Sequence, residues 1–400
     1  GKFDFKKIAE AELIVMSPGI SSFKFPEFRK LKQPGSEVIS EIELAFRFFR
    51  GKLIAVTGTN GKSTTASLVH HLFKVAGKKS YLLGNIGTPF ISEAENIKAD
   101  EYAVVEVSCF QLEEIKSFKP DYVILTNISR DHLDRYPSME SYMETRKNIF
   151  RNITSQDKVI FNFDDPLTQK HFSRLSAEEN YRFSRKSKVS RGAFLSENNF
   201  IFRNHGRDMV FANSSYLQIP GAHNIENALS ASLPLLLEGI DTSLIKKGLK
   251  TFRGLKHRME FVSRFGGVDF INDSKATNVD SVLRAVESFN SAQGQIVIIM
   301  GGKDKAGDFS LLKPALNDNI KLVLLGEAAA LIESCLSATV NLKRVKTMAE
   351  AVRVSFDRAK PAGLVILSPG CASFDMFKSF EHRGDVFKAE VMKLKEKQNG

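Results

Sequence analysis

The amino-acid sequence predicts an α/β protein built from mainly parallel sheets. Short apolar runs alternate with amphipathic stretches along most of the 400 residues, a pattern typical of buried strands followed by helices. A glycine-rich turn at residues 58–64 separates one apolar run from a predicted helix, and polar loops follow several other runs. Ligands of open α/β sheets bind at such strand ends, so the same pattern indicates where a site lies.

The predicted strands are the most apolar runs of the chain. In order they are residues 13–16, 53–56, 102–107, 122–125, 159–162, 268–271, 296–300, 322–325 and 364–367. The segment 194–219 differs, because its short alternating pieces are broken by asparagines and by Gly206. This segment therefore predicts antiparallel hairpins.

Two breaks divide the chain, since 400 residues are too many for one hydrophobic core. We expect domains at residues 1–50, 51–254 and 255–400. The first is short for an α/β domain, and the chain opens on Gly1 without an initiator methionine. We therefore expect a partial N-terminal domain in a chain shortened at its N-terminus.

Composition excludes several classes of function. The net charge of +11 could indicate a nucleic-acid partner, but the basic residues are spread along the chain and no nucleic-acid module is present. A solvated surface that attracts anionic nucleotides is the favoured interpretation. Three widely spaced cysteines form no CxxC pair, which fits a reducing cytoplasm rather than a disulfide framework. No apolar run is long enough to span a membrane.

The glycine-rich turn predicts binding of ATP with Mg²⁺. Backbone N–H groups and a helix N-terminus converge there on one small volume, a lysine adds positive charge, and a hydroxyl can bind Mg²⁺. The residues concerned are Gly58, Thr59, Asn60, Gly61, Lys62, Ser63 and Thr64. The alternative is a glycine turn without a ligand, because Val56 stands where the general phosphate-loop pattern has its first glycine.

Polar residues after other strands suggest further ligands. Glu106 ends an apolar run and is a candidate Mg²⁺ ligand, the alternative being an edge glutamate in solvent. The Asp131–Asp134 segment suits a metal or phosphate site, or a capped helix start. Asn224 and Asn227 lie on adjacent helical turns and could bind a base or a phosphate, or cap the helix. Three polar loops, at residues 272–278, 301–305 and 368–375, predict a second ligand surface in the last domain.

Together these motifs resemble the ATP-dependent Mur ligases over essentially the whole chain. Further matches are residues 84–87, 106–113, 257–260 and 368–384. The last of these resembles the branch of the family that adds D-glutamate to UDP-N-acetylmuramoyl-L-alanine in peptidoglycan synthesis. The resemblance implies a three-domain architecture, with a partial N-terminal Rossmann-like domain, a central P-loop-type domain with a small antiparallel extension, and a C-terminal Rossmann-like domain.

The resemblance also implies roles for individual residues. Those implied to take part in catalysis are Lys62, Glu106, His132, Arg146 and Lys275. Mg²⁺ would be held by Ser63, Glu106 and His132, and the nucleotide would also contact Asn224, Asn227, Arg258 and Asp273. Ser17 and Gly19 match the loop that meets the UDP diphosphate, while Asn85 and Gln111 match contacts to the muramoyl substrate. D-Glutamate or the reacting phosphate would be surrounded by Lys275, Thr277, Lys305, Ser373 and Phe380.

The implied reaction converts the alanyl carboxylate to an acyl phosphate with ATP, after which the amine of D-glutamate attacks. The last domain is expected to close over the central one and to bring Arg258 to the phosphates.

One departure concerns Arg146, which stands where the family usually has a carbamylated lysine. A guanidinium stays protonated and does not take up carbon dioxide, and Lys147 points about 100° away on a helix. We expect Arg146 to contact the substrate carboxylate or phosphate directly, with a weaker second metal site.

Two alternatives stay open. The chain could be a sibling ligase for another amino acid, such as a folylpolyglutamate-type synthase, or a nucleotide-binding protein without catalysis. A cytoplasmic monomer is expected, with no nucleic-acid or membrane partner.

Overall fold

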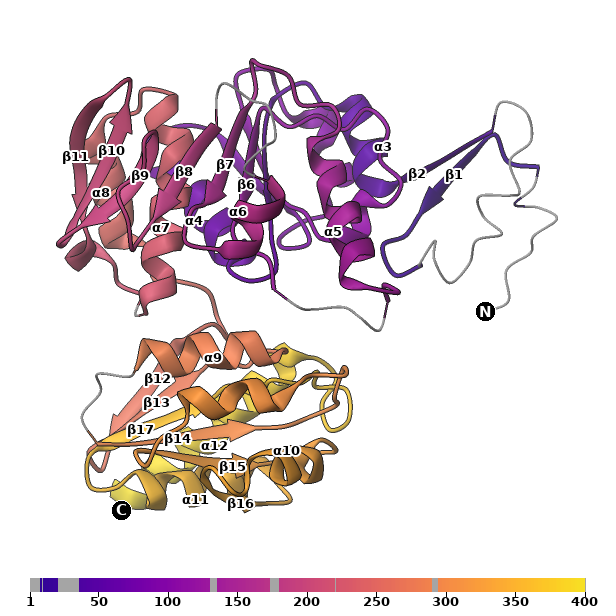
Figure 1. Cartoon of the computed structure of the whole chain (residues 1–400). Coiled ribbons are helices and arrows are strands. Elements are labelled where there is room, and N and C mark those ends of the chain that lie inside the picture. The colour runs from indigo at the N-terminus through magenta and orange to yellow at the C-terminus, as the bar shows by residue number, and fades with distance from the viewer. Residues whose placement is uncertain are drawn as a thin grey trace. The chain divides into compact units, whose positions relative to one another are not determined.

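The computed structural model describes residues 8, 10–20, 36–129, 135–172, 180–219, 221–289 and 294–399 (Figure 1). The chain forms two compact units. The first comprises Gly1–Gln218 with Asn224–Phe252, and the second comprises Ile219–His223 with Arg253–Gly400. The predicted domain limits at residues 50/51 and 254/255 stay predictions.

In the part of the chain that the structure describes, a nine-stranded sheet forms the centre of the first unit, with the order β11-β10-β9-β8-β7-β6-β3-β5-β4. Its strands pair in parallel from β4 to β9, and β9, β10 and β11 pair antiparallel. The strands are β3 (Lys52–Thr57), β4 (Ser80–Gly84), β5 (Tyr102–Glu106), β6 (Tyr122–Leu125), β7 (Lys158–Asn162), β8 (Asn180–Ser184), β9 (Gly192–Ser196), β10 (Asn199–Asn204) and β11 (Arg207–Asn213).

Helices cover this sheet on both faces because its central strands are apolar on both sides. Leu53 and Ala55 of β3 belong to a core cluster shared with α3 (Glu41–Phe48), α5 (Met139–Lys147) and α6 (Pro166–Phe172). Outside that cluster, α4 (Lys62–Val75) contacts β3, β4 and β5 and packs on α8 (Thr242–Thr251). Further helical segments of the first unit are α7 (Ala222–Leu237) and the 3₁₀ turns η1 (Phe90–Ser92), η2 (Ala94–Asn96), η3 (Cys109–Leu112), η4 (Asn148–Phe150) and η5 (Ser214–Tyr216).

The hairpins predicted between residues 194 and 219 are confirmed by β9, β10 and β11. Both turns use left-handed backbone, with φ of 56° at Glu197 and of 46° and 74° at His205 and Gly206. Such turns match the twist of antiparallel strands.

A small parallel sheet precedes β3. It consists of β1 (Leu13–Met16) and β2 (Glu37–Ser40), and α3 follows β2 directly. Within α3 the buried carboxylate of Glu43 accepts hydrogen bonds from the backbone N–H groups of Lys116, Ser117 and Phe118. This contact holds α3 against the body of the first unit.

Among the described residues, a six-stranded sheet forms the centre of the second unit, in the order β12-β13-β17-β14-β15-β16. All neighbours are parallel except β12 and β13. The strands are β12 (Glu260–Phe265), β13 (Val268–Asn272), β14 (Gln295–Met300), β15 (Ile320–Leu324), β16 (Asn341–Arg344) and β17 (Gly363–Leu367).

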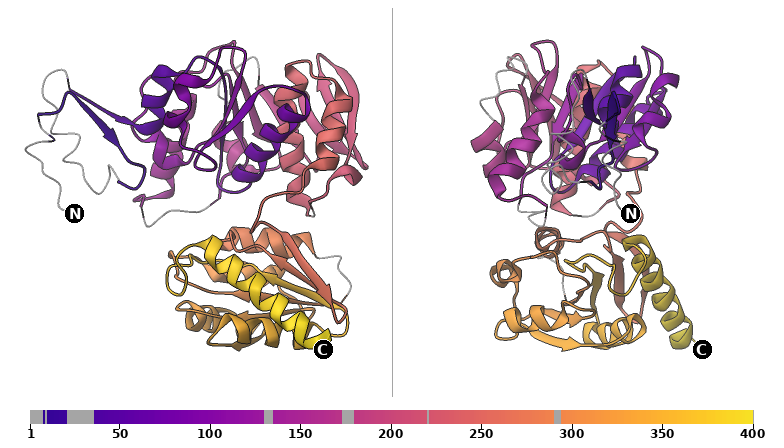
Figure 2. Two further views of the ribbon diagram at one scale, coloured as in Figure 1. Left: turned by 180° about the vertical axis from the view of Figure 1, so that it is seen from behind. Right: turned by 90° about the vertical axis from the view of Figure 1, so that its right-hand side faces the viewer.

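Two cores lie on the two faces of this second sheet. On one face α9 (Val279–Ser288), η6 (Phe309–Ala315) and α10 (Ala329–Leu336) pack over residues such as Ile298. On the other, α11 (Met348–Ala359) and α12 (Phe380–Asn399) pack over residues such as Val297. Figure 2 shows α12, in yellow, lying along its face of the sheet. The α/β fold class is thus confirmed.

A search of the described helices finds none that is both long enough and apolar enough to cross a membrane.

Candidate functional site

The turn between β3 and α4 has a backbone that suits glycine at two positions. Gly58 has a φ of 136° and Gly61 a φ of 82°, both in the left-handed region. A Cβ at Gly58 would lie 2.0 Å from Thr126 Oγ1, and one at Gly61 would lie 2.6 Å from Asn227 Oδ1. Because α4 begins directly after Gly61, its first N–H groups open toward the turn. The turn is therefore a close-packed cradle of the kind that holds phosphate.

Residues after β6 hold this turn in shape. The carbonyl of Asn127 accepts from the N–H of Thr59 at 2.9 Å, and its side-chain oxygen accepts from the N–H of Asn60 at 2.9 Å. Lys62 Nζ donates to the carbonyl of Thr59 at 2.7 Å, so its charge already lies at the turn. Ser63 and Thr64 are buried in the first turn of α4.

Arg146 lies under the turn, 1% exposed, rather than at a surface. Its Nη1 donates to Thr57 Oγ1 at 2.6 Å, and its Nη2 donates to the hydroxyl of Tyr142. That hydroxyl in turn lies 3.0 Å from Thr59 Oγ1. Burial disfavours the charged guanidinium, yet the Tyr142 and Cys109 side chains raise the pKa of Arg146 above its usual value. The predicted direct contact of Arg146 with substrate stays a prediction.

Glu106 ends β5 beside this turn and is 1% exposed. Asn85 Nδ2 donates to Glu106 Oε1 at 3.0 Å, so the structure brings together a predicted metal ligand and a predicted substrate contact. The third proposed ligand, His132, lies outside the described residues. Within those residues, no group of three or more His, Cys, Asp or Glu side chains is arranged to hold a metal ion. A hydroxyl and one carboxylate nevertheless suit Mg²⁺, which keeps several of its waters in proteins.

Helix α7 places two asparagines against the start of α4. Asn227 Nδ2 donates to Asn224 Oδ1 at 2.9 Å, and Thr65 Oγ1 donates to Asn227 Oδ1 at 3.2 Å. Both asparagines are buried. The structure therefore joins Asn224 and Asn227 to the phosphate-loop region.

The side chain of Gln111, a predicted substrate contact, binds the backbone of its own turn. Its side-chain oxygen accepts from the N–H of Ser108 at 3.0 Å, which caps the 3₁₀ turn η3. At the other predicted substrate loop, an added Cβ at Gly19 would meet no atom within 4 Å, so this glycine is open to its surroundings.

In the second unit the predicted ligand residues follow the strand ends as expected. Asp273 comes directly after β13, and Ser368 Oγ, after β17, donates to Asp273 Oδ2 at 3.2 Å. Lys275 Nζ lies 5.3 Å from the centre of the Phe380 ring, so a cation–π contact joins two predicted substrate residues. Thr277 and Lys305 are half-buried and Ser373 is buried. Arg258 lies close enough to influence the charge of Asp273.

We expect the free energy of unfolding to fall as pH rises from about 4 to about 7 because of Asp273. Burial raises the pKa of Asp273 from its ordinary 3.8 to about 7, although Arg258 opposes this. Over that range the folded protein holds a proton that the unfolded chain has lost, so a higher pH favours unfolding. Denaturant titrations of wild type and Asp273→Asn at several pH values measure this. The two curves should converge near pH 4, with the variant the more stable above pH 7; parallel curves would contradict the prediction.

One arginine of the 368–384 match, to which the sequence assigned no role, joins the loops of the second unit. Arg383, 2% exposed, donates from Nη2 to the carbonyl of Ser274 at 2.8 Å and from Nη1 to the carbonyl of Cys371 at 3.1 Å. Ser274 Oγ donates to the carbonyl of Phe380 at 2.8 Å. Arg383 therefore connects the loop after β13, the loop after β17 and the start of α12.

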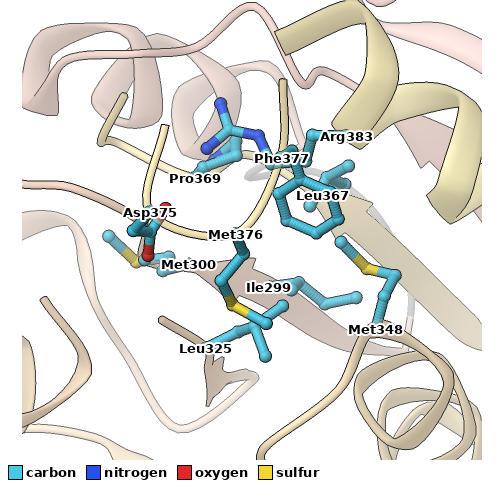
Figure 3. Close-up of a pocket in the computed structure, with 12 residues that line it drawn as sticks. Ile299, Met300, Leu325, Met348, Leu367, Pro369, Asp375, Met376, Phe377 and Arg383 are labelled. Carbon is cyan, nitrogen blue, oxygen red and sulfur yellow. The ribbon is translucent and has the colours of Figure 1, made fainter. Parts of the chain in front are cut away.

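A small pocket of about 240 Å³, part of it open to solvent, lies at these strand ends. Figure 3 shows Met300, Met348 and Met376 around it, with Asp375 and Arg383 also on its wall. Because this pocket is smaller than most ligand pockets, we assign no ligand to it.

A second arginine that the sequence did not single out is Arg135, which contacts the loop containing Ser17 and Gly19. The sequence assigned no role to either arginine, since both act on backbone carbonyls, which no residue pattern marks.

Comparison with known families finds two matches. The Mur ligase middle domain matches residues 56–234, and the glutamate ligase domain of the Mur ligases matches residues 257–371.

Two curated relatives cover nearly the whole chain. The UDP-N-acetylmuramoylalanine–D-glutamate ligase of Trichlorobacter lovleyi is 41% identical over 395 residues, which are 98% of this chain and 87% of the relative. The protein of that name from Clostridioides difficile is 40% identical over 392 residues, 97% of this chain and 86% of the relative.

Solved structures with the same fold are more distant in sequence. The UDP-N-acetylmuramate–alanine ligase of Thermotoga maritima superimposes with a TM-score of 0.64 at 19% identity, covering 97% of this chain and 86% of that one. A MurF ligase of the same organism, solved in complex with ADP, gives a TM-score of 0.65 at 17% identity, covering 98% and 97%.

Proposed function

Because the chain belongs to the Mur ligase family, we propose that it joins D-glutamate to UDP-N-acetylmuramoyl-L-alanine with the hydrolysis of ATP to ADP and phosphate. The observation that carries the choice of D-glutamate is the similarity to two D-glutamate ligases over nearly the whole chain. The product is a precursor of peptidoglycan. We further propose that the enzyme works in the cytoplasm, where ATP and UDP-linked precursors are present.

In this proposal the Gly58–Thr64 turn holds the polyphosphate of ATP. The turn's backbone supports this, because Gly58 and Gly61 have left-handed φ values and pack so closely on Thr126 and Asn227 that no side chain fits at either position. Lys62 supplies a positive charge beside the transferred phosphoryl group. Ser63, Glu106 and His132 are the residues we propose for Mg²⁺, which when bound neutralises charge on the phosphate oxygens. Asn224, Asn227, Arg258 and Asp273 are proposed nucleotide contacts.

The reaction begins at the alanyl carboxylate, which is a poor acyl donor. Its oxygen attacks the γ-phosphorus of ATP, the bond to ADP breaks, and an acyl phosphate results. The neutral amine of D-glutamate then attacks the acyl carbon, a C–N bond forms, and phosphate leaves with loss of one amine proton. Lysine ammonium groups form charge-assisted hydrogen bonds with carboxylates, so we propose that Lys275 and Lys305 bind the two carboxylates of D-glutamate. Thr277, Ser373 and Phe380 complete the proposed amino-acid site.

The muramoyl substrate needs contacts of its own. We assign Asn85 and Gln111 to its sugar and peptide part, and Ser17 with Gly19 to its diphosphate. A monomeric state also stays a proposal.

Phosphate release tests the proposed function. Purified protein is given Mg·ATP, UDP-N-acetylmuramoyl-L-alanine and one amino acid at a time, and phosphate is measured. Release should require D-glutamate, and should be absent with L-glutamate or meso-diaminopimelate and in the Lys62→Ala variant. Preference for another amino acid, or for a folate-type acceptor, would establish a sibling ligase instead. If the protein binds nucleotide but releases no phosphate with any combination of substrates, it is a nucleotide-binding protein without catalysis.

A further inference from the structure

Arg135 joins two segments of the first unit that are far apart in the sequence. Its Nε and Nη2 donate to the two carboxylate oxygens of Glu113 at 2.9 and 3.0 Å. From the other side of the guanidinium, Nη1 donates to the carbonyl of Pro18 at 2.8 Å and Nη2 donates to the carbonyl of Ile20 at 3.0 Å. The Arg135 side chain is 10% exposed and that of Glu113 is 4% exposed. The pair is therefore a nearly buried, two-pronged ion pair with fixed geometry.

The surroundings of this pair fix its orientation further. The Arg135 guanidinium lies over the Phe110 ring, with its Cζ 4.4 Å from the ring centre. Tyr136 donates from its hydroxyl to Glu113 Oε1 at 2.9 Å, and its ring stacks on that of Phe110. Arginine is suited to this role because its planar donors are arranged in advance, so little rotational freedom is lost per hydrogen bond.

The segment that Arg135 holds is a tight turn. The N–H of Ile20 donates to the carbonyl of Ser17 at 2.9 Å, which closes the turn around Pro18 and Gly19. Met16, just before it, packs with Val38 in a small cluster that also includes Ile20. The turn is short and the hydrophobic cluster beside it is small, so these two features provide few contacts that order the turn. Ordering the backbone of a turn costs conformational entropy, so contacts that fix the turn before binding strengthen the binding of its ligand.

We infer that Arg135 is a positioning residue for the UDP end of the substrate. It holds the turn containing Ser17 and Gly19 in the conformation that receives the diphosphate. The inference rests on the proposed function, because that function assigns the turn to the UDP-linked substrate. Arg135 acts through two backbone carbonyls and does not itself touch substrate. Its removal should therefore weaken binding of this one substrate and leave ATP and D-glutamate binding alone.

The test uses calorimetry and kinetics on the full chain. The probe is UDP-N-acetylmuramoyl-L-alanine, titrated without ATP or amino acid. Arg135→Met keeps the stem over Phe110 but removes the positive charge beside the buried Glu113 carboxylate, which endangers folding. The Arg135→Met/Glu113→Gln double variant also removes the carboxylate charge and keeps an acceptor for Tyr136. Arg151→Met is the matched control, because Arg151 also donates to a backbone carbonyl, that of Ile115, at 3.0 Å.

For the folded double variant we expect a dissociation constant for the probe raised about 10- to 100-fold, with the matching rise in KM. kcat at saturation and the KM values for ATP and D-glutamate should stay within about threefold of wild type, and Arg135→Lys should fall in between. Unchanged affinity for the probe in the double variant, or an equal rise in all three KM values, would overturn the inference. Failure of wild type to bind the probe would instead count against the proposed function.

Discussion

Replacing Arg146 with methionine is expected to lower kcat by about 10²–10³-fold while leaving the protein at least as stable as wild type. Most changes to a buried side chain lower activity and stability together. Here kcat is expected to fall while stability does not, because Arg146 carries a buried charge and because its two hydroxyl partners keep other hydrogen bonds in its absence.

The guanidinium of Arg146 is buried against two hydroxyl groups, and across the described ranges no carboxylate lies within ion-pair distance of it. Its buried Nε has no hydrogen-bond acceptor there. Its two hydroxyl partners keep other partners when it is removed, since Thr57 Oγ1 donates to the carbonyl of Val107 at 2.9 Å and the Tyr142 hydroxyl lies 3.0 Å from Thr59 Oγ1. Replacing a buried ion pair by apolar side chains of similar volume is often neutral or stabilising, by about 1–4 kcal/mol, because the desolvation cost of the charges is removed. We expect the same saving when the charge of Arg146 is removed. A positive charge under a phosphate loop, with no carboxylate partner among the described residues, is useful when a polyanion binds above it.

Denaturant unfolding and phosphate-release kinetics measure the two effects on one preparation. Lys147→Met is the matched control, because Lys147 is the next residue of α5 and forms a half-exposed ion pair with Glu144. This variant should retain wild-type activity, and the intact mass of the wild-type protein should show no carbamate on Lys147. A large loss of stability in Arg146→Met would make Arg146 a structural residue. Unchanged kcat in a folded variant would remove it from the catalytic group.

The sequence predicted best the strands that lie at the middle of each sheet. β3, β5, β6 and β17 are buried on both faces and therefore read as unbroken apolar runs. The strands that were not predicted are shorter or more polar. β16, for example, reads Asn-Leu-Lys-Arg at a sheet edge and is mostly exposed, so it carries no such run. Polar edge strands of this kind contain no apolar run, so an apolar run does not predict them.

The site follows the same logic at a finer scale. Glycines and residues directly after strands were predicted, because local geometry fixes their position: Gly58 and Gly61 have the left-handed φ that the turn requires. The roles of Arg135 and Arg383 were missed, because the carbonyls that Arg135 binds are more than 100 positions away and those that Arg383 binds lie on two separate loops. A carbonyl exists at every residue, so nothing in a sequence marks which one an arginine will meet.

Arg383→Met should lower kcat with D-glutamate by about 10²-fold and, unlike Arg146→Met, destabilise the second unit. The difference lies in the partners. Arg383 donates to the carbonyls of Ser274 and Cys371, and within the described residues no other donor reaches either carbonyl. A buried polar group left without a partner costs about 1–3 kcal/mol. Loss of Arg383 also releases the loops that carry Lys275 and Ser373 relative to each other.

Thermal unfolding of the full chain, followed with and without D-glutamate, separates these effects. Arg344→Met is the matched control, because Arg344 forms an exposed 3.4 Å ion pair with Glu333 in the same unit, and such pairs contribute only about 0–1 kcal/mol. The control should unfold and turn over like wild type. Arg383→Lys, which keeps the charge but reaches fewer carbonyls, should show an intermediate KM for D-glutamate if loop position is what matters. If Arg383→Lys instead restores stability completely and leaves D-glutamate turnover as low as in Arg383→Met, the guanidinium must act on the substrate itself, and the positioning role fails.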